Sequence, residues 1–281
     1  MTSSIAAIEA GAENTGSSEK PIFVFSAGWR SGSTLLQRLL MSGNDTLIWG
    51  EAYDRACIIQ RLTETVFAHS ETWPDREYLR QPTSLHRLSS KWVANLYPPR
   101  AALKLGYRAL LENMFVVPAR EVGARRWGFK EVRLGVNEAE FLHWLFPNAR
   151  FLFIYRNPFD AYQSYKNFQP AKNWYVRWPD KTAFTTAKFA KHWRELASDF
   201  VKNASNVDGM LVKYEDLIDG RVNLDVLADY CELDIDKSIL EVRLGGMNKA
   251  GCGVSSLTGI ERLIISRCTA PTACQLGYLA G

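Results

Sequence analysis

The sequence of 281 residues lacks any long apolar run. No stretch approaches the roughly 20 consecutive apolar residues that cross a bilayer, and residues 1–20 contain neither the basic nor the apolar segment of a secretory signal. These absences argue against a membrane span and predict a cytoplasmic protein. Residues 1–20 are small and polar, which predicts a disordered leader ahead of a single domain at 21–281.

Cysteine and histidine are also scarce. The five cysteines are odd in number and form no CxxC pair, so neither a disulfide framework nor a zinc or redox site is predicted. The four histidines are scattered without a ligand motif, and no metal is expected. We interpret the cysteines as reduced and mostly structural, and the histidines as surface or packing residues.

The sequence has no strong excess of either charge. Lysine and arginine number 34 against 30 aspartates and glutamates, the formal net charge is +4, and no basic block resembles a nucleic-acid stripe. Hydrophobic residues make up 47% and charged residues 23%, which is ordinary for a globular protein with a sizeable core. Small acidic ligands therefore fit better than DNA.

A strand, a glycine loop and a helix are predicted at residues 21–43. Residues 22–25 are an apolar run of strand formers, Gly28 and Gly32 flank a polar turn, and leucines follow at the spacing of one helical face. Such a loop points backbone N–H groups and a helix N-terminus at one place, which suits a phosphate or sulfate. An ordinary glycine turn with a solvated arginine is the alternative interpretation.

The loop lacks the features of a Walker A motif. That motif needs more residues between its two glycines than separate Gly28 and Gly32, and no lysine precedes Ser33. An ordinary nucleoside triphosphatase is therefore disfavoured.

Strands and helices alternate through the rest of the chain. Further strands are predicted near 47–49, 126–132, 150–155 and 210–214, and helices at 159–168, 182–203 and 222–231. This alternation predicts an α/β fold with a central parallel sheet and helices on both faces. Residues from about 55 to 121 form a predicted helical lobe, rich in aromatics and broken by prolines. The polar, glycine-rich tail from Gly245 is predicted to be a loop, either over a ligand or on the surface.

Four motifs then follow in order. They are GWRSGST at residues 28–34, GE at 50–51, Arg156 with Ser164, and YEDL at 214–217. This set resembles the sulfotransferase family that uses 3′-phosphoadenosine 5′-phosphosulfate, in particular the branch similar to tyrosylprotein and carbohydrate sulfotransferases and their bacterial relatives. The resemblance covers residues 21 to about 217 and implies a P-loop-like three-layer α/β/α fold.

The resemblance also implies a donor site. The loop would bind the 5′-phosphosulfate, Arg156 and Ser164 would bind the 3′-phosphate, and Tyr214 would lie near the adenine or the 3′-phosphate. The product would be adenosine 3′,5′-bisphosphate, and no metal is implied. The loop residues concerned are Gly28, Trp29, Arg30, Ser31, Gly32, Ser33 and Thr34.

Three residues are candidates for catalysis. Glu51 matches the family's general base, and Lys130 resembles the lysine of a K-D-P segment, although Glu131 and Val132 replace Asp-Pro here. Arg30 cannot donate a proton, so it would stabilise charge on the bridging and leaving oxygens. Lys130 would do the same or donate a proton. His86, in the lobe, is an alternative base.

The acceptor implied is the hydroxyl of a small molecule: an aromatic alcohol, a lipid-like hydroxyl or a carbohydrate. The missing membrane anchor favours a bacterial cytoplasmic enzyme of specialised metabolism. Two alternatives stay open, a P-loop-like small-molecule or nucleotide kinase, which would need magnesium, and a non-catalytic nucleotide-binding protein. The sequence predicts no oligomeric state.

Overall fold

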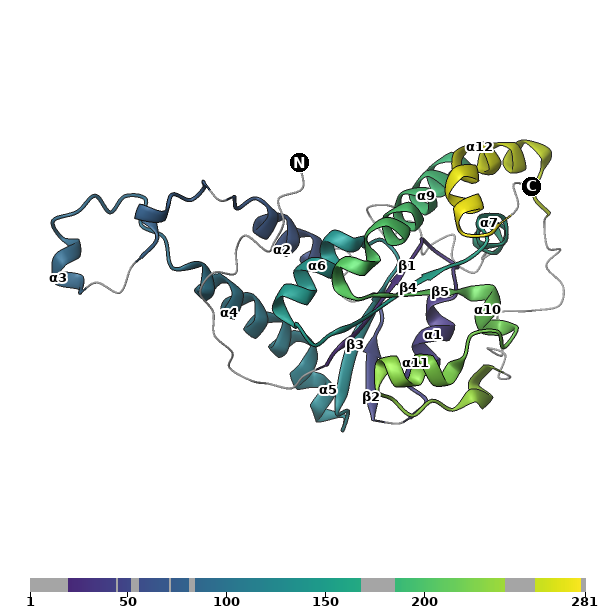
Figure 1. Ribbon diagram of the computed structural model, residues 1–281, viewed down its shortest axis with the longest axis horizontal. Coiled ribbons are helices and arrows are strands. Elements are labelled where there is room, and N and C mark those ends of the chain that lie inside the picture. Colours follow the sequence, from purple (N-terminus) through teal and green to yellow (C-terminus); the bar gives the residue numbers. More distant parts are fainter. Residues whose placement is uncertain are drawn as a thin grey trace.

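A parallel sheet lies at the centre of the molecule (Figure 1). The computed structural model describes residues 20–43, 45–51, 56–70, 72–80, 84–167, 185–240 and 256–278. Within these residues one five-stranded sheet has the order β2-β3-β1-β4-β5, with every pairing parallel. Its strands are β1 (Ile22–Ser26), β2 (Thr46–Trp49), β3 (Arg126–Glu131), β4 (Arg150–Tyr155) and β5 (Met210–Lys213). The predicted central parallel sheet is confirmed.

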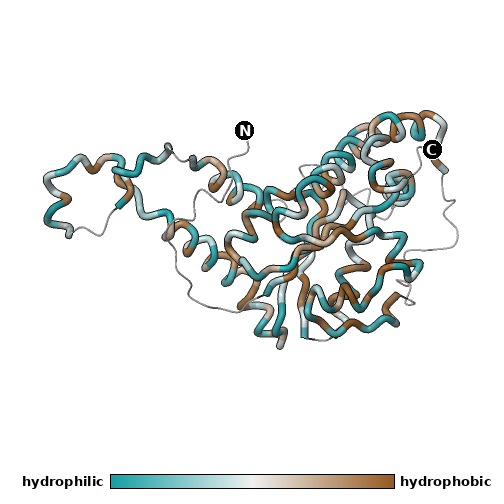
Figure 2. Tube along the Cα trace, viewed as in Figure 1, coloured by the Kyte–Doolittle hydropathy of each residue, from teal (hydrophilic) through white to brown (hydrophobic). Residues whose placement is uncertain are grey.

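The strands are apolar on both faces, as expected for a parallel sheet that helices cover on each side. In β1 and β4, the pair Phe23 and Phe151 packs on one face, and the pair Val24 and Leu152 packs on the other. All four side chains are fully buried. Figure 2 shows the apolar residues concentrated along these central strands.

Helices form a layer on each face of the sheet, which confirms the three-layer α/β/α fold. The phenylalanine face packs against α6 and α9, and the Phe189, Trp193 and Phe200 stripe of α9 is buried there, as its spacing predicts. The opposite face packs against α1, α10 and α11. The bounds are α1 (Ser33–Leu40), α6 (Val136–Leu145), α9 (Thr186–Asn203), α10 (Tyr214–Ile218) and α11 (Leu224–Cys231), with short 3-10 turns η6 (Ala204–Val207) and η7 (Lys237–Leu240).

The region between β2 and β3 is mainly helical. Its elements are α2 (Ile58–Phe67), η3 (Arg76–Tyr78), α3 (Leu85–Leu88), α4 (Arg100–Leu111), a π-helical turn η4 (Glu112–Val116) and α5 (Val117–Glu121). Figure 1 shows the chain between α2 and α4 reaching away from the sheet, with α3 at its far end. We call the described residues of 72–99 the extension. It starts and ends at one place, because Arg100 Nη2 donates to the carbonyl of Ser70 at 2.8 Å.

The C-terminal segment corrects the sequence prediction of a loop. Residues Gly259–Gln275 form helix α12, which packs on α9 and on α7 (Pro158–Lys166). Thr258 and Glu261 form a capping box at its start, and Glu261 also pairs with Lys166 at 2.9 Å. Of the glycines that suggested a loop, Gly259 is the first residue of this helix, and those at 245, 246, 251 and 253 lie outside the described residues.

Among the described helices, none combines the length and the apolar character that crossing a membrane requires.

Candidate active site

The predicted site residues gather at the carboxyl edge of the sheet, where ligands bind in open α/β folds. Glu51 follows β2, Lys130 lies near the end of β3, and the glycine loop follows β1. Arg156 follows β4, and Tyr214 follows β5. Because all five strands are parallel, these residues from distant parts of the chain share one edge.

The glycine loop has the backbone conformation of an anion-binding turn. Gly28, Arg30 and Gly32 all have positive φ values, of 78°, 64° and 97°. Gly32 is the N-cap of α1, and in this part of the structure no side chain caps the helix and no acidic residue lies in its first turn. A Cβ on Gly32 would lie 2.2 Å from Cδ2 of Tyr214, so glycine is required sterically as well. The backbone N–H groups in the first turn of α1 are therefore not capped by a side chain and are available to a ligand.

Several loop side chains hold the loop in shape. Ser31 is fully buried and its hydroxyl donates to the carbonyl of Ala27 at 2.9 Å. Trp29 packs in the core, with its ring 4.7 Å from that of His192. Ser33 is also buried, whereas Thr34 is exposed. For Trp29 and Ser31 this leaves the backbone as the part that can meet a ligand.

Arg30, Ser164, Arg156 and Tyr214 come together beside this loop. Arg30 Nε donates to Ser164 Oγ at 3.0 Å, and Arg156 Nη1 donates to the carbonyl of Arg30 at 3.1 Å. The Arg156 guanidinium lies over the Tyr214 ring, 4.3 Å from its centroid. Arg156 Nε is buried and has no hydrogen-bond partner in the described part of the chain. Two guanidinium groups thus border a glycine loop at a helix N-terminus.

Glu51 and Lys130 form a second group. Lys130 Nζ lies 2.5 Å from Glu51 Oε1, and Arg133 Nη2 lies 2.9 Å from Glu51 Oε2. Arg133 also pairs with Glu131 at 2.9 Å. All four side chains are largely buried. The Trp49 indole, two residues before Glu51, donates to the carbonyl of Phe115 in the π-helical turn at 3.1 Å, which ties the end of β2 to η4.

Sequence reasoning missed Arg133 at this edge and described His192 only as a surface or packing residue. Arg133 lies in a largely apolar run after β3, and that run is the only signal that could have indicated a buried arginine. His192 on α9 packs on Trp29, and its Nε2 lies 3.2 Å from the carbonyl of Val132. The next residue, Trp193, donates to the carbonyl of Arg156 at 3.0 Å. Helix α9 therefore contacts the segments after β1, β3 and β4.

The alternative base His86 lies on α3, at the far end of the extension (Figure 1). It does not lie with Glu51 and Lys130 at the strand ends.

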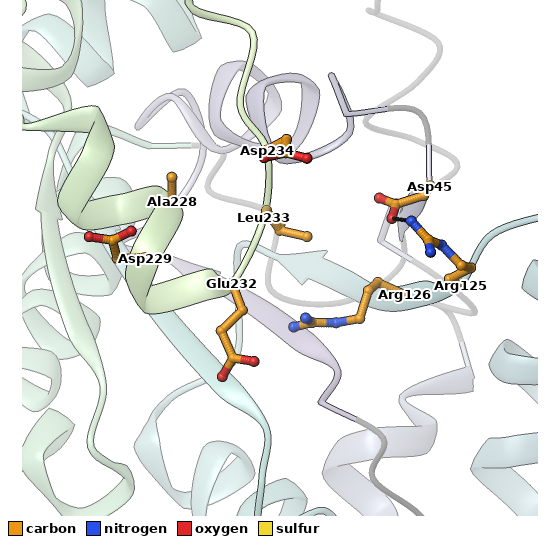
Figure 3. Close-up of a pocket in the computed structure, with 8 residues that line it drawn as sticks. All are labelled: Asp45, Arg125, Arg126, Ala228, Asp229, Glu232, Leu233 and Asp234. Atoms are coloured by element: carbon orange, nitrogen blue, oxygen red, sulfur yellow. Dashed lines mark hydrogen bonds and ion pairs between the residues drawn. The ribbon is translucent and has the colours of Figure 1, made fainter.

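A cavity of about 440 Å³ lies away from these residues. Figure 3 shows its charged lining, in which Arg125 and Asp45 pair at 2.6 Å and Arg126 points toward the end of α11. Arg126 begins β3 and Asp45 precedes β2, so the cavity is at the amino edge of the sheet. It is therefore separate from the candidate active site.

The model of the sulfotransferase family matches residues 21–237, most of the chain. The chain belongs to the sulfotransferase family. This membership supports a transferase that moves a sulfuryl group, and favours it over the kinase alternative. Helix α12 lies beyond the range matched by the sulfotransferase model.

The solved sulfotransferase domain from the curacin biosynthetic pathway has a similar fold. It has a TM-score of 0.52 and 17% identity, covering 93% of this chain and 98% of that one. The sulfotransferase domain from the Synechococcus PCC 7002 olefin synthase has a TM-score of 0.48 and 17% identity, covering 95% and 98%. At this identity the likeness concerns the fold. No curated protein sequence matches the chain.

Proposed function

We propose that this sulfotransferase transfers a sulfuryl group from 3′-phosphoadenosine 5′-phosphosulfate to a hydroxyl of a small-molecule acceptor. The observation that carries the proposal is a cluster of side chains beside the glycine loop, linked by hydrogen bonds and one cation–π contact. Its members are Arg30, Ser164, Arg156 and Tyr214. Two cationic groups, a hydroxyl and an aromatic ring fit a nucleotide with phosphate groups at two positions better than one with a single phosphate.

The residues present fit this donor, which supplies an activated sulfuryl group on a phosphate leaving group. The turn from Gly28 to Gly32 and the uncapped start of α1 offer backbone N–H groups to the 5′ end. Arg156 has a buried Nε without a partner in the described residues and an adjacent hydroxyl at Ser164, and these suit the 3′-phosphate. Tyr214 provides a flat face beside them.

The cations at the site stabilise the charge that develops during transfer. Arg30 remains protonated, so it acts by charge and hydrogen bonding rather than by giving up a proton. Lys130 is held near the strand ends with a largely buried ammonium group, where a charge is worth more than in water. It either stabilises the leaving oxygen or gives that oxygen a proton.

Glu51 is the proposed general base. It takes the proton of the acceptor hydroxyl while that oxygen bonds to sulfur and the bond between sulfur and the 5′-phosphate oxygen breaks. The products are the sulfated acceptor and adenosine 3′,5′-bisphosphate. Contacts with Lys130 and Arg133 keep the carboxylate at the carboxyl edge of the sheet.

The acceptor is proposed to meet the helical lobe, about 55–121, and its extension. Three aromatic side chains of the extension are well exposed: Trp73 at 51%, Trp92 at 72% and Tyr97 at 37%. Two acidic residues and four exposed basic residues lie among them. The basic residues are Arg76, Arg80, Arg87 and Lys91. Such a surface suits an acceptor with a flat or apolar face and a negative charge.

Calorimetry without magnesium tests the donor assignment. We expect adenosine 3′,5′-bisphosphate to bind at least tenfold more tightly than adenosine 5′-monophosphate or ATP, about 1.4 kcal/mol. Preference for ATP that appears only with magnesium would contradict the proposal and revive the kinase alternative. Acceptor candidates are then screened with a sulfate-labelled donor, which separates an enzyme from a binding protein.

A further inference from the structure

Arg133 is the most buried member of the group around Glu51, with 3% of its side chain exposed. It lies between β3 and α6, and no motif assigns it a role. We propose that Arg133 is a positioning residue for the sulfuryl transfer: it fixes Glu51 so that Lys130 can leave that carboxylate during the reaction. This inference rests on the function proposed above.

Arg133 is itself anchored to the sheet. Its Nη2 lies 2.9 Å from Glu131 Oε1, and its Nε donates to the same oxygen at 3.1 Å. That oxygen also accepts the backbone N–H of Val132 at 2.7 Å. Glu131 is the last residue of β3 and pairs with Phe25 of β1. A continuous series of contacts therefore runs from the central strands through Glu131 and Arg133 to Glu51.

The two oxygens of Glu51 have different partners. Oε1 contacts Lys130 and Oε2 contacts Arg133. If Lys130 were the sole partner, moving its ammonium group toward a ligand would leave a largely buried carboxylate without a counter-charge, which is costly. Arg133 keeps one oxygen paired. Arginine does not release its proton, so Arg133 gives none to Glu51. The carboxylate can therefore take the proton of the acceptor hydroxyl.

The charge balance of the group agrees with this division. Glu51 and Glu131 offset Lys130 and Arg133, so the buried group is neutral overall. Lys130 is 11% exposed at its side chain, whereas Arg133 is 3% exposed. Lys130 is thus the cation that can reach a ligand, and Arg133 is the cation that stays.

A double-mutant cycle tests the role. Single-turnover transfer from labelled donor is measured for the wild type, Glu51→Gln, Arg133→Gln and the double variant. We expect Arg133→Gln to slow transfer about 100-fold, the usual cost of a misplaced reacting group. In the Glu51→Gln background it should cost nothing more, since residues that act as one unit are not additive. Equal slowing in both backgrounds would overturn the positioning role.

Two further variants separate positioning from folding. Arg133→Lys keeps a cation near Glu51 and should restore transfer to within about tenfold of the wild type, by analogy with other retained charge contacts. Glu131→Gln weakens the anchor of Arg133 and replaces Arg133→Gln in the cycle if that variant does not fold. No rescue by lysine, or additivity of Glu131→Gln with Glu51→Gln, would contradict the proposal.

Arg150→Gln is the matched control. Arg150 is the first residue of β4 and pairs with Glu232 at 2.6 Å, at the start of that strand. This is the opposite edge of the sheet. Its loss should leave the transfer rate the same in both backgrounds.

Binding provides a readout apart from turnover. The affinity of Arg133→Gln for adenosine 3′,5′-bisphosphate should be within about twofold of that of the wild type. This difference is smaller than the loss of one direct contact with the ligand would cause. Loss of this binding would overturn the role, because it would place Arg133 in the donor site. If the wild type shows no preference for the bisphosphate, the proposed function is overturned. If the wild type binds the bisphosphate and transfers sulfate, but the effects of the Arg133 and Glu51 substitutions on the rate are additive, only the positioning role is overturned.

Discussion

Arg156 joins segments that lie far apart in the chain. It donates to the carbonyl of Arg30 and stacks on Tyr214, while its own carbonyl accepts from Trp193. Replacing Arg156 with Ala removes one charged hydrogen-bond donor, for which about 1.5 to 3 kcal/mol is typical. We expect adenosine 3′,5′-bisphosphate to bind roughly 10- to 100-fold more weakly, with little change for adenosine 5′-monophosphate. Equal losses in calorimetry for both nucleotides would remove the 3′-phosphate role.

Gly32 combines a positive φ with a close neighbour, and the two effects can be separated. Gly32→Ala places a Cβ 2.2 Å from Tyr214, whereas Gly123→Ala, at φ 86°, meets nothing within 4 Å. Both variants pay the cost of the backbone conformation, about 1 kcal/mol. We expect the Gly32 variant to lose roughly 1 to 3 kcal/mol more in urea unfolding, and to bind bisphosphate poorly. Similar losses for both variants would mean that the Tyr214 ring moves aside freely.

The candidate site was predicted from sequence where a motif fixes a residue to the end of a strand. Arg156 follows its apolar run directly and Glu51 follows its own after Gly50, so the place of both at the sheet edge follows from the parallel topology. Arg133 and His192 could not be found in this way. Their places at this edge come from contacts across the fold, with Glu51 and with Trp29, which no local spacing encodes.

Helix α12 begins with a reciprocal cap. Thr258 Oγ1 accepts the Glu261 N–H at 3.2 Å, and Glu261 accepts from the Thr258 N–H and from Lys166. We expect Thr258→Ala to cost about 1 kcal/mol in free energy of unfolding, the usual value of an N-cap. Urea titration measures it. The comparison is Thr185→Ala, which removes the cap of α9, and a silent Thr258 variant would mean that packing alone sets the start of α12.

The sequence signal of α12 is weak for a physical reason. Its buried face consists of Ile265 with the smaller Thr269, Thr272 and Ala273, so the apolar periodicity is low. Pro271 lies inside the helix and reads as a breaker. The strong stripe of α9, in contrast, made that helix predictable. Small residues allow close packing between helices without giving a hydrophobic pattern.

Burial makes one thiol and three tyrosine hydroxyls of the folded protein harder to deprotonate. Burial raises the pKa of the Cys231 thiol from 9.0 to about 12, and also raises the pKa values of Tyr155, Tyr230 and Tyr278. The unfolded chain releases these protons at lower pH than the folded one. Stability from this source is therefore complete below about pH 9 and is lost as the pH rises toward 12.

Unfolding by urea at a series of pH values measures this loss. The thiol alone accounts for on the order of 4 kcal/mol between pH 9 and 12. The free energy of unfolding of Cys231→Ala should be lower than that of the wild type at pH 7, because the substitution leaves a small cavity. Above pH 9 it should fall less steeply with pH than that of the wild type. Identical slopes for the two proteins would contradict a retained thiol proton.

Three aromatic residues of the extension, Trp73, Trp92 and Tyr97, are exposed, whereas Tyr78 is half-buried. The aromatic content of the lobe was evident in the sequence, where burial in a core was the more frequent expectation for such residues. Their exposure follows from the place of the extension, which reaches away from the three layers (Figure 1). Composition alone does not distinguish an aromatic residue in a core from one on a projecting segment.

Excision of residues 71–99 tests the proposed division of labour. Joining Ser70 to Arg100 through three glycines should leave bisphosphate binding within about threefold of the wild type, since the donor site lies on the sheet edge. Turnover of acceptor should fall by at least 100-fold if the extension positions it. A variant with normal acceptor turnover would remove the extension from the acceptor site.

The hydrogen bond between Arg100 and Ser70 has a consequence for how such a protein can diversify. A segment whose two ends meet can lengthen, shorten or be exchanged without moving the layers that carry it. Recognition of the acceptor is then able to change while the apparatus for the donor is inherited intact. One would look for new specificities in the exchange of this segment between enzymes, with the strand ends left as they are.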